Sequence, residues 1–248
     1  MRMLVFLVNM KKRFFNVKFN LTDYVLWLSS MGVIILAFFI FDSKGYLDLA
    51  ASLIGVTSLI FSAKANPIGP ILMIIFSILY GVISYTFRYY GEMITYLGMT
   101  LPMSVFALSE WLKNPFDGNR AQVRVGGIKK RDVIILVLAT VAVTGGFYFC
   151  LWKLKTANLL ISTVSVATSF IAAYFTLKRS PFFALGYAIN DGVLIVMWVL
   201  ASLVDRGYLS VVICFVVFLV NDAYGFISWC AIKKHQDLVL AEKDKTGD

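Results

Sequence analysis

The sequence contains little of the side-chain chemistry on which most soluble enzymes depend. Its one histidine, His235, lies beyond the last long apolar run, which argues against His-based triads and most zinc sites. No Cys-x-x-Cys pair and no Gly-x-x-x-x-Gly-Lys-Ser/Thr loop occurs. The three cysteines, Cys150, Cys214 and Cys230, lie in or at the ends of apolar runs. We therefore expect no enzyme, no cofactor and no metal ion.

Charged residues are also few, at 15% of the chain, whereas 60% of residues are hydrophobic and the mean hydropathy is +0.81. Soluble domains are typically about 45–50% apolar. The excess lies in continuous runs of about 20 residues, the length of a membrane-spanning helix, and not in the alternating pattern of a β-barrel. The sequence predicts an all-α polytopic membrane protein. Its eight expected transmembrane helices cover residues 24–41, 46–63, 67–87, 93–112, 133–152, 158–177, 181–204 and 208–230.

The 23 Lys and Arg residues exceed the 14 Asp and Glu residues, which gives a net charge of +9. If the N-terminus is cytoplasmic, 18 of the 23 fall on the cytoplasmic side, in agreement with the positive-inside rule. Both termini are then cytoplasmic, and the N-terminus is interpreted as a retained tail because it has no signal-peptide pattern. Nucleic-acid binding is not expected, since no basic face carries interleaved aromatic residues outside the spans.

The two halves of the chain resemble each other. Phe61–Pro67 is similar to Phe175–Pro181, an offset of 114 residues, and in both a basic loop leads to a Pro that begins the next span. Equivalent spans are four apart, so the halves face the same way and form parallel repeats; chance similarity is the alternative. The expected parts are a cytoplasmic tail at 1–23, an extra N-terminal helix at 24–41, a first three-helix repeat at 46–112, a basic cytoplasmic loop and linker helix at 113–157, a second three-helix repeat at 158–230 and a cytoplasmic tail at 231–248.

The most unusual polar residues, Asn190 and Asp191, lie near the middle of the seventh span. An Asp at the centre of a bilayer costs about 2.5 kcal/mol or more, and such a residue normally faces a cavity and marks a functional site. Tyr187, Leu194 and Trp198 share its helical face. We predict that this face contacts a ligand or ion; a polar clamp between helices is the alternative.

The eighth span carries a second pair, Asn221 and Asp222, and Tyr224 shares a face with Asn221. Whether Asp222 faces the site or only packs is left open. Trp229, near the end of this span, and Trp111, near the end of the fourth, are expected to be anchors at the membrane interface.

The first half is less polar. At the 114-residue offset, Phe76 and Ser77 correspond to Asn190 and Asp191. A site between the halves would therefore have one polar wall and one apolar or aromatic wall, near the midplane where transporters of this construction bind their substrates. Pro102 lies within the fourth span, where it is expected to kink the helix.

Three short motifs give the chain a resemblance to the PnuC-type vitamin transporters. They are Asn190 within Ala-Ile-Asn, the Tyr224-Gly225-x-x-x-Trp229 ending, and the first-half segment from Tyr90-Gly91-Glu92-Met93 through Trp111-Leu112-Lys113-Asn114. The resemblance covers about residues 46–232. It implies a three-plus-one-plus-three helix arrangement like that of a full-length SWEET transporter, with one extra N-terminal helix. It also implies a bacterial inner membrane protein.

The resemblance further implies facilitated diffusion of nicotinamide riboside, made one-way by a cytoplasmic kinase that phosphorylates the substrate without stable contact. Other members carry thiamine, riboflavin or deoxynucleosides. The sequence departs from the nicotinamide riboside pattern at Phe76, where a first-half Asn is common, and at Asp191, where an apolar residue is usual. These departures leave the substrate open.

Chemically, a ribose needs amide and carboxyl partners, whereas a pyridinium ring favours aromatic faces. Proton coupling through Asp191 is an alternative transport mode, and an intramembrane enzyme or a scaffold is the non-transport alternative. The oligomeric state stays open, with a homo-oligomer as one outcome. The expected substrate-binding residues are Asn190, Asp191, Tyr187, Trp198, Asn221, Asp222, Tyr224, Phe76, Ser77 and Tyr80.

Overall fold

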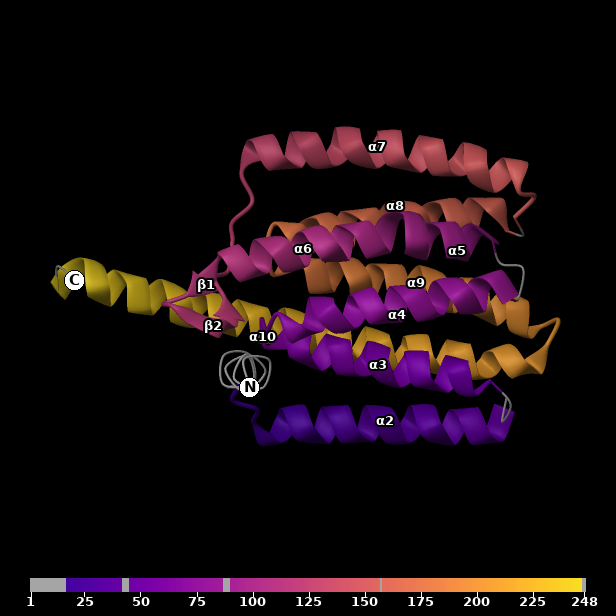
Figure 1. Cartoon of the computed structure of the whole chain (residues 1–248), viewed down its shortest axis with the longest axis horizontal. Helices are drawn as coiled ribbons and strands as arrows, with labels where there is room; N and C mark the ends of the chain where they lie inside the picture. The colour runs from indigo at the N-terminus through magenta and orange to yellow at the C-terminus, as the bar shows by residue number, and fades with distance from the viewer. Residues whose placement is uncertain (1–16, 42–44, 87–89, 157, 247–248) are drawn as a thin grey trace, which may run out of the picture.

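The computed structural model describes residues 17–41, 45–86, 90–156 and 158–246, which form a bundle of helices lying side by side (Figure 1). Seven of the described helices are long and apolar enough to cross a membrane. This agrees with the predicted helical membrane protein. The long helices are α2 (Leu21–Phe41), α3 (Tyr46–Ala63), α4 (Ile68–Thr86), α7 (Lys130–Lys153), α8 (Leu159–Leu177), α9 (Phe182–Ser202) and α10 (Leu209–Thr246).

The fourth predicted span is built from three pieces: α5 (Tyr90–Thr95), the π-helix η1 (Tyr96–Thr100) and α6 (Leu101–Lys113). In the π-helical turn, the Leu101 N–H bonds to the Tyr96 carbonyl, five residues back. The sequence predicts a kink at Pro102. The structure instead widens the turn just before Pro102, an irregularity that is frequent at functional sites.

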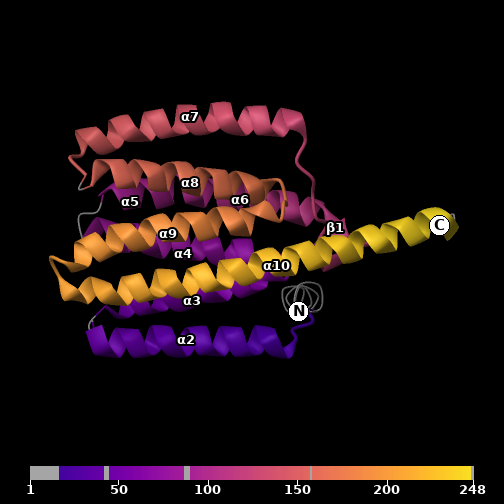
Figure 2. The ribbon, with the colours of Figure 1, turned by 180° about the vertical axis from the view of Figure 1, so that it is seen from behind.

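The helices form two groups that meet in the middle of the bundle. α4 packs against both α3 and α6 in one group, and α9 packs against both α8 and α10 in the other. The groups touch where α6 meets α8 and where α3 meets α10. At opposite edges of the bundle lie α2, which packs on α3 and α10, and α7, which packs on α8 (Figures 1 and 2). The buried residues of α7 are Leu136 and Leu151, so most of its surface is left to face lipid.

The segment between the halves is tied to both of them at one end of the bundle. It begins with an antiparallel hairpin of β1 (Pro115–Phe116) and β2 (Asn119–Val123). The Val123 N–H then donates to the Ala65 carbonyl, and the Gly126 N–H donates to the Arg179 carbonyl, each at 2.8 Å. Ala65 and Arg179 have φ angles of 54° and 55°. This left-handed conformation ends α3 and α8 in the same way.

Trp111 and Trp229 are not interface anchors, so that prediction is wrong. Both are buried, with ring centroids 5.4 Å apart. The Trp111 indole N–H donates to the Thr176 carbonyl at 2.9 Å, and the Trp229 indole N–H donates to the Ser62 carbonyl at 2.6 Å. Each indole therefore bonds the end of the first helix of the opposite group. The sequence pattern missed this because a Trp near a span end looks the same in both settings.

Both segments expected to be tails need comment. The predicted N-terminal tail lies largely outside the described residues. In the segment 231–248 that follows the predicted last span, α10 continues without a break to Thr246. Gln236 fixes this extension, because its side chain donates to the Val123 carbonyl and accepts from the Val125 N–H.

Candidate substrate-binding site

A small cavity of about 40 Å³ lies between the two helix groups, near the middle of α9. Its polar side chains come from the second half except for Thr100, and its large aromatic side chains come mostly from the first half and from α10. Among the described residues that line it, none is Lys, Arg or His. The lining residues used below are Phe76, Tyr96, Thr100, Ser169, Tyr187, Asn190, Asp191, Phe215, Phe218 and Asp222.

Asn190 is held in a fixed orientation by α8. Its side-chain oxygen accepts hydrogen bonds from the Thr168 hydroxyl at 2.8 Å and from the Ser169 hydroxyl at 2.9 Å. The Asn190 side chain is buried, with 4% of the residue exposed. Because both bonds use its oxygen, Asn190 would meet a ligand as a hydrogen-bond donor through its NH2 group.

Two buried carboxyl groups, those of Asp191 and Asp222, lie within hydrogen-bonding reach of each other across the α9–α10 contact. A hydrogen bond between two carboxyls needs a proton on one of them, so the pair carries at most one negative charge in this geometry. Asp191 Oδ2 is buried without a hydrogen-bond partner among the described residues. The cavity therefore offers a ligand a buried carboxyl pair that carries at most one negative charge.

A second cavity, of about 110 Å³, lies toward the end of the bundle opposite β1 and β2. It shares Phe76, Phe215 and Phe218 with the first, so these rings form a partition between the two cavities. Tyr80 lines this second cavity, and its buried hydroxyl has no hydrogen-bond partner among the described residues. Trp198 and Tyr208 also line this cavity, with their ring centroids 5.5 Å apart and their planes tilted by 45°. We name these cavities the inner cavity and the outer cavity.

The structure brings together seven of the ten predicted site residues. Phe76, Tyr187, Asn190, Asp191 and Asp222 line the inner cavity. Phe76 also faces the outer cavity, together with Tyr80 and Trp198.

The remaining three are directed to other partners. The Ser77 hydroxyl donates to the Met73 carbonyl on its own helix. The Asn221 amide donates to the Ser30 hydroxyl of α2 at 2.9 Å and to the Val217 carbonyl. Tyr224 donates its hydroxyl to Asp23. A helical stripe in the sequence does not distinguish a cavity from a neighbouring helix, which is why these residues were included.

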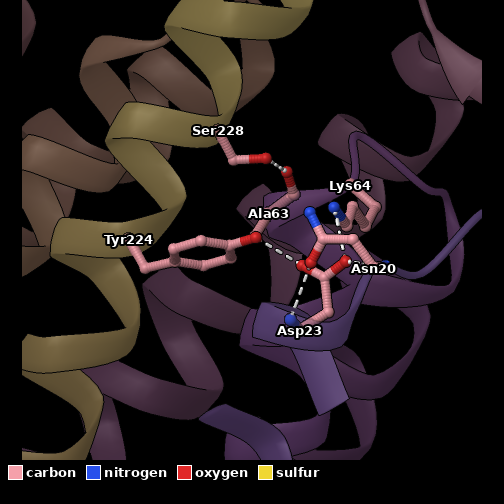
Figure 3. Close-up of polar contacts among 6 residues, drawn as sticks. All are labelled: Asn20, Asp23, Ala63, Lys64, Tyr224 and Ser228. Carbon is pink, nitrogen blue, oxygen red and sulfur yellow. Dashed lines mark hydrogen bonds and ion pairs between the residues drawn. The ribbon is translucent and has the colours of Figure 1, made fainter. Parts of the chain in front are cut away.

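Tyr224 belongs to a polar cluster that attaches α2 to the bundle (Figure 3). The fully buried carboxylate of Asp23 also binds the Lys64 ammonium at the end of α3, at 2.6 Å. Asp23 further accepts from the Asn20 backbone N–H, closing the first turn of α2. Figure 3 shows these groups converging from α2, α3 and α10. The cluster lies away from both cavities, and its contacts are those of a helix clamp.

Six polar or aromatic contacts were missed by sequence reasoning. Phe215 and Phe218 of α10 line both cavities. The other four are Tyr96, Thr100, Thr168 and Ser169. Tyr96 and Thr100 bound the π-helical turn and line the inner cavity, while Thr168 and Ser169 orient Asn190. Pro102, just after the π-helix, is the sequence signal that points to Tyr96 and Thr100. No comparable signal marks Thr168 and Ser169, because Ser and Thr are common in membrane helices where they bond their own backbone.

A bundle of membrane-spanning helices that encloses a polar and aromatic cavity between two helix groups is the construction expected of a small-molecule transporter. The comparisons with known proteins agree. The model of the nicotinamide mononucleotide transporter family matches residues 45–231. The chain belongs to this family of PnuC-type transporters.

One curated relative is the nicotinamide riboside transporter PnuC of Neisseria mucosa. The two are 27% identical over 203 residues, covering 79% of this chain and 77% of the relative. Among solved structures, the crystal structure of the vitamin B3 transporter PnuC matches with a TM-score of 0.77. That match covers 91% of this chain and 97% of the other at 23% identity, and it shows a shared fold.

Proposed function

We propose that the chain carries nicotinamide riboside, or a closely related nucleoside-like vitamin precursor, into the cell by facilitated diffusion. The observation that carries this proposal is the composition of the inner cavity. One wall presents the Asn190 amide and the Asp191–Asp222 carboxyl pair, and the other presents the Phe76 and Tyr96 rings. Amide and carboxyl groups suit ribose hydroxyls, which donate and accept, and aromatic faces suit a pyridinium ring.

The inner and outer cavities are both smaller than the about 300–1,000 Å³ of typical small-molecule pockets. A nucleoside-sized substrate can therefore be held only when the partition between them moves. Phe76 and Phe218 are the rings to move, because they face both cavities and pack against each other at 6.0 Å between centroids. We propose that their displacement joins the two cavities into one site.

We also propose that the fold consists of two parallel three-helix repeats. The first is α3, α4 and α5–α6, the second is α8, α9 and α10, α7 is the linker and α2 is the extra helix. Matching contacts support this. Ala65 and Arg179 are 114 residues apart and share a left-handed conformation. Their carbonyls accept from Val123 and Gly126, in the segment that leads into α7. The carbonyls of Ser62 and Thr176, also 114 apart, accept from Trp229 and Trp111.

We further propose that the protein is embedded in a bacterial inner membrane, with the end of the bundle that carries β1, β2 and the C-terminal part of α10 in the cytoplasm. Lys64, Lys178 and Arg179 lie at this end, as positive-inside orientation favours. The outer cavity then opens toward the outside. A cytoplasmic kinase that phosphorylates the substrate would make uptake one-way without contacting the transporter.

Purified protein in sealed liposomes tests the transport proposal. Liposomes loaded with unlabelled nicotinamide riboside should exchange it for external labelled compound, at a rate independent of any imposed pH gradient. Empty protein-free liposomes are the control. Absence of exchange at every pH would refute transport of this compound.

Proton coupling is the second candidate, and the Asp191–Asp222 pair favours it because the pair holds a proton when its carboxyls are hydrogen-bonded. In this case an inwardly directed proton gradient alone would accumulate labelled substrate above its external concentration. In the same liposomes, facilitated diffusion would only equalise the two concentrations.

A thermal-shift series distinguishes the substrates that family members carry. Nicotinamide riboside, thiamine, riboflavin and a deoxynucleoside are compared at equal concentration with the purified protein. A ligand at one hundred times its Kd stabilises the folded state by about 2.7 kcal/mol. The largest shift is expected with nicotinamide riboside, and a larger shift with another compound would reassign the substrate.

A further inference from the structure

A third cavity, of about 400 Å³, lies beside the outer cavity and is not part of the path described above. It is formed by the first turn of α5, the turn between α7 and α8, and the end of α9. Trp198, Asp205 and Tyr208 line both this cavity and the outer cavity, so the two are neighbours. We name it the lateral cavity.

Two buried polar groups in the wall of the lateral cavity have no hydrogen-bond partner among the described residues. Glu92 is 7% exposed, and its Oε2 atom has no hydrogen-bond partner among the described residues. The Thr156 hydroxyl, buried in the same wall, likewise lacks a partner there. A buried carboxyl oxygen without a partner is costly, and each such group in a folded protein calls for an explanation.

The position of Glu92 in the first turn of α5 offsets part of this cost, but it does not explain why the Glu92 side chain is buried in the cavity. A carboxyl in the first turn of a helix is favoured by the helix dipole. That benefit is available to a solvent-exposed carboxyl as well. Gly91, the preceding residue, has no room for a side chain, since an added Cβ would lie 3.0 Å from Thr156 Cγ2. The close approach of α5 to the α7–α8 turn therefore encloses Glu92 and Thr156 in one pocket.

The rest of the lining is aromatic and acidic. The Trp198 and Tyr208 rings lie against each other at a tilt of 45°, and Asp205 adds a second carboxylate to the lining. Among the described residues that line the cavity, none is Lys, Arg or His. A carboxylate beside aromatic faces, without a competing basic group, is the combination that recognises an organic cation.

We propose that the lateral cavity is a second, outer subsite where an organic cation binds before it enters the outer cavity, with Glu92 as its counter-charge and Trp198–Tyr208 as its aromatic wall. The inference rests on the proposed function for the identity of that cation, the pyridinium nucleoside. Its volume suits a ring and part of a ribose, whereas a bare metal ion would leave most of it empty. Its neighbour, the outer cavity, leads to the partition at Phe76 and Phe218.

The test uses 1-methylnicotinamide, which keeps the pyridinium charge and lacks the ribose, with uncharged nicotinamide as the comparison. Binding is measured by calorimetry on the N190A protein in phosphatidylglycerol nanodiscs, so that the Asn190 donor of the inner cavity is removed and no choline headgroup is present. 1-Methylnicotinamide should bind to N190A. It should bind to N190A/E92Q at least about tenfold more weakly, because the counter-charge is lost. Nicotinamide should bind N190A at least about tenfold more weakly than the cation.

E110Q in the N190A background is the matched control, because Glu110 is a partly exposed carboxylate at the other end of the bundle, paired with Lys113. It should bind 1-methylnicotinamide as N190A does. T156V is a second variant, expected to weaken binding less than E92Q. Equal melting temperatures of the variants establish that each is folded.

Equal affinities of N190A and N190A/E92Q for 1-methylnicotinamide would overturn the proposal, as would no binding to folded N190A. Binding that disappears when phosphatidylcholine replaces phosphatidylglycerol would assign the cavity to a lipid headgroup and also overturn it. Wild-type counterflow with nicotinamide riboside separates this from the proposed function. If exchange occurs without Glu92-dependent binding, only the subsite fails; if Glu92-dependent binding occurs without exchange, only the transported compound is wrong.

Discussion

The two halves of the molecule differ most at the positions that face the cavities and least at the positions where the helices meet the linker. In α9, Asn190 and Asp191 face the inner cavity, whereas 114 residues earlier in α4 Phe76 faces it and Ser77 bonds its own helix. One helix earlier, Ser169 of α8 bonds Asn190, and Gly55 of α3 makes room for rings. The two halves, which we propose to be repeats, thus present two different walls to a ligand.

The difference teaches which residues are free to change. Ala65 and Arg179 must both end a helix in a left-handed conformation and accept from the linker, and Trp111 and Trp229 must both bridge the halves. The residues that line the cavities do not make these contacts between the helices and the linker. Substitutions at paired positions therefore separate contributions to the frame from contributions to the site.

The largest effect is expected from Asn190→Ala, compared with Asn221→Ala on the next helix. Asn190→Ala removes the proposed donor to the substrate and leaves the Ser169 hydroxyl without its acceptor, whereas the Thr168 hydroxyl can still donate to carbonyls of its own helix. Leaving a buried polar group unpaired costs about 1–3 kcal/mol, so nicotinamide riboside should bind at least about tenfold more weakly. Binding is measured by calorimetry on the purified protein.

Asn221 is the matched control because it faces α2 and bonds Ser30. Its alanine variant should lower the melting temperature while the Kd stays near that of the wild type. A loss of affinity in Asn221→Ala equal to that in Asn190→Ala would place the ligand elsewhere.

The next effect comes from the carboxyl pair. Since the Asp191 and Asp222 carboxyls lie within hydrogen-bonding reach and together carry at most one negative charge in that geometry, either one alone could supply it. The single variants D191N and D222N should therefore each cost less than D191N/D222N, which should weaken binding of cationic nicotinamide riboside by about tenfold or more. The uncharged dihydronicotinamide form, with the same ribose, provides the comparison by calorimetry.

Equal losses for the charged and the uncharged ligand in the double variant would mean that the pair acts through hydrogen bonds to the ribose. Simple additivity of the two single variants would also contradict a shared charge, because residues that act as one unit are non-additive.

The sequence predicted the helical membrane bundle well because hydropathy reports a backbone-level constraint. The orientation from Lys and Arg placement and the repeat from the Pro67 and Pro181 segments stay predictions. The sequence also predicted the α9 wall, since Asn190 and Asp191 are conspicuous in an apolar run. It could not predict Tyr96 or Thr100, whose positions depend on the π-helical turn. It misplaced Trp111 and Trp229 because their burial depends on how the two halves meet, which no local pattern records.

A smaller effect, on stability, is expected from a substitution at Gly55, where α3 approaches α10. A Cβ on Gly55 would lie 2.5 Å from the Phe218 ring and 3.1 Å from the Phe76 ring. Gly55→Ala should therefore shift the partition and destabilise the fold by about 1–3 kcal/mol, as overpacking does. Gly32→Ala in α2 is the control, because nothing lies within 4 Å of its added Cβ. Thermal unfolding in detergent measures both, and an unchanged melting temperature for Gly55→Ala would mean that the two rings move aside freely.

The smallest effects on stability are expected at Trp111 and Trp229, which should respond alike to the same substitution. Trp111→Phe and Trp229→Phe each keep an aromatic ring and remove one indole N–H, which leaves the Thr176 or the Ser62 carbonyl without that donor. Each should cost about 0.5–1.5 kcal/mol of stability, the usual value of one hydrogen bond, with substrate Kd unchanged. Because the centroids of the two indole rings lie 5.4 Å apart, the loss of stability in the double variant should differ from the sum of the losses in the single variants. A large loss for one tryptophan and none for the other would show that only one bridge holds the halves together, and the frame would then be as asymmetric as the cavity it encloses.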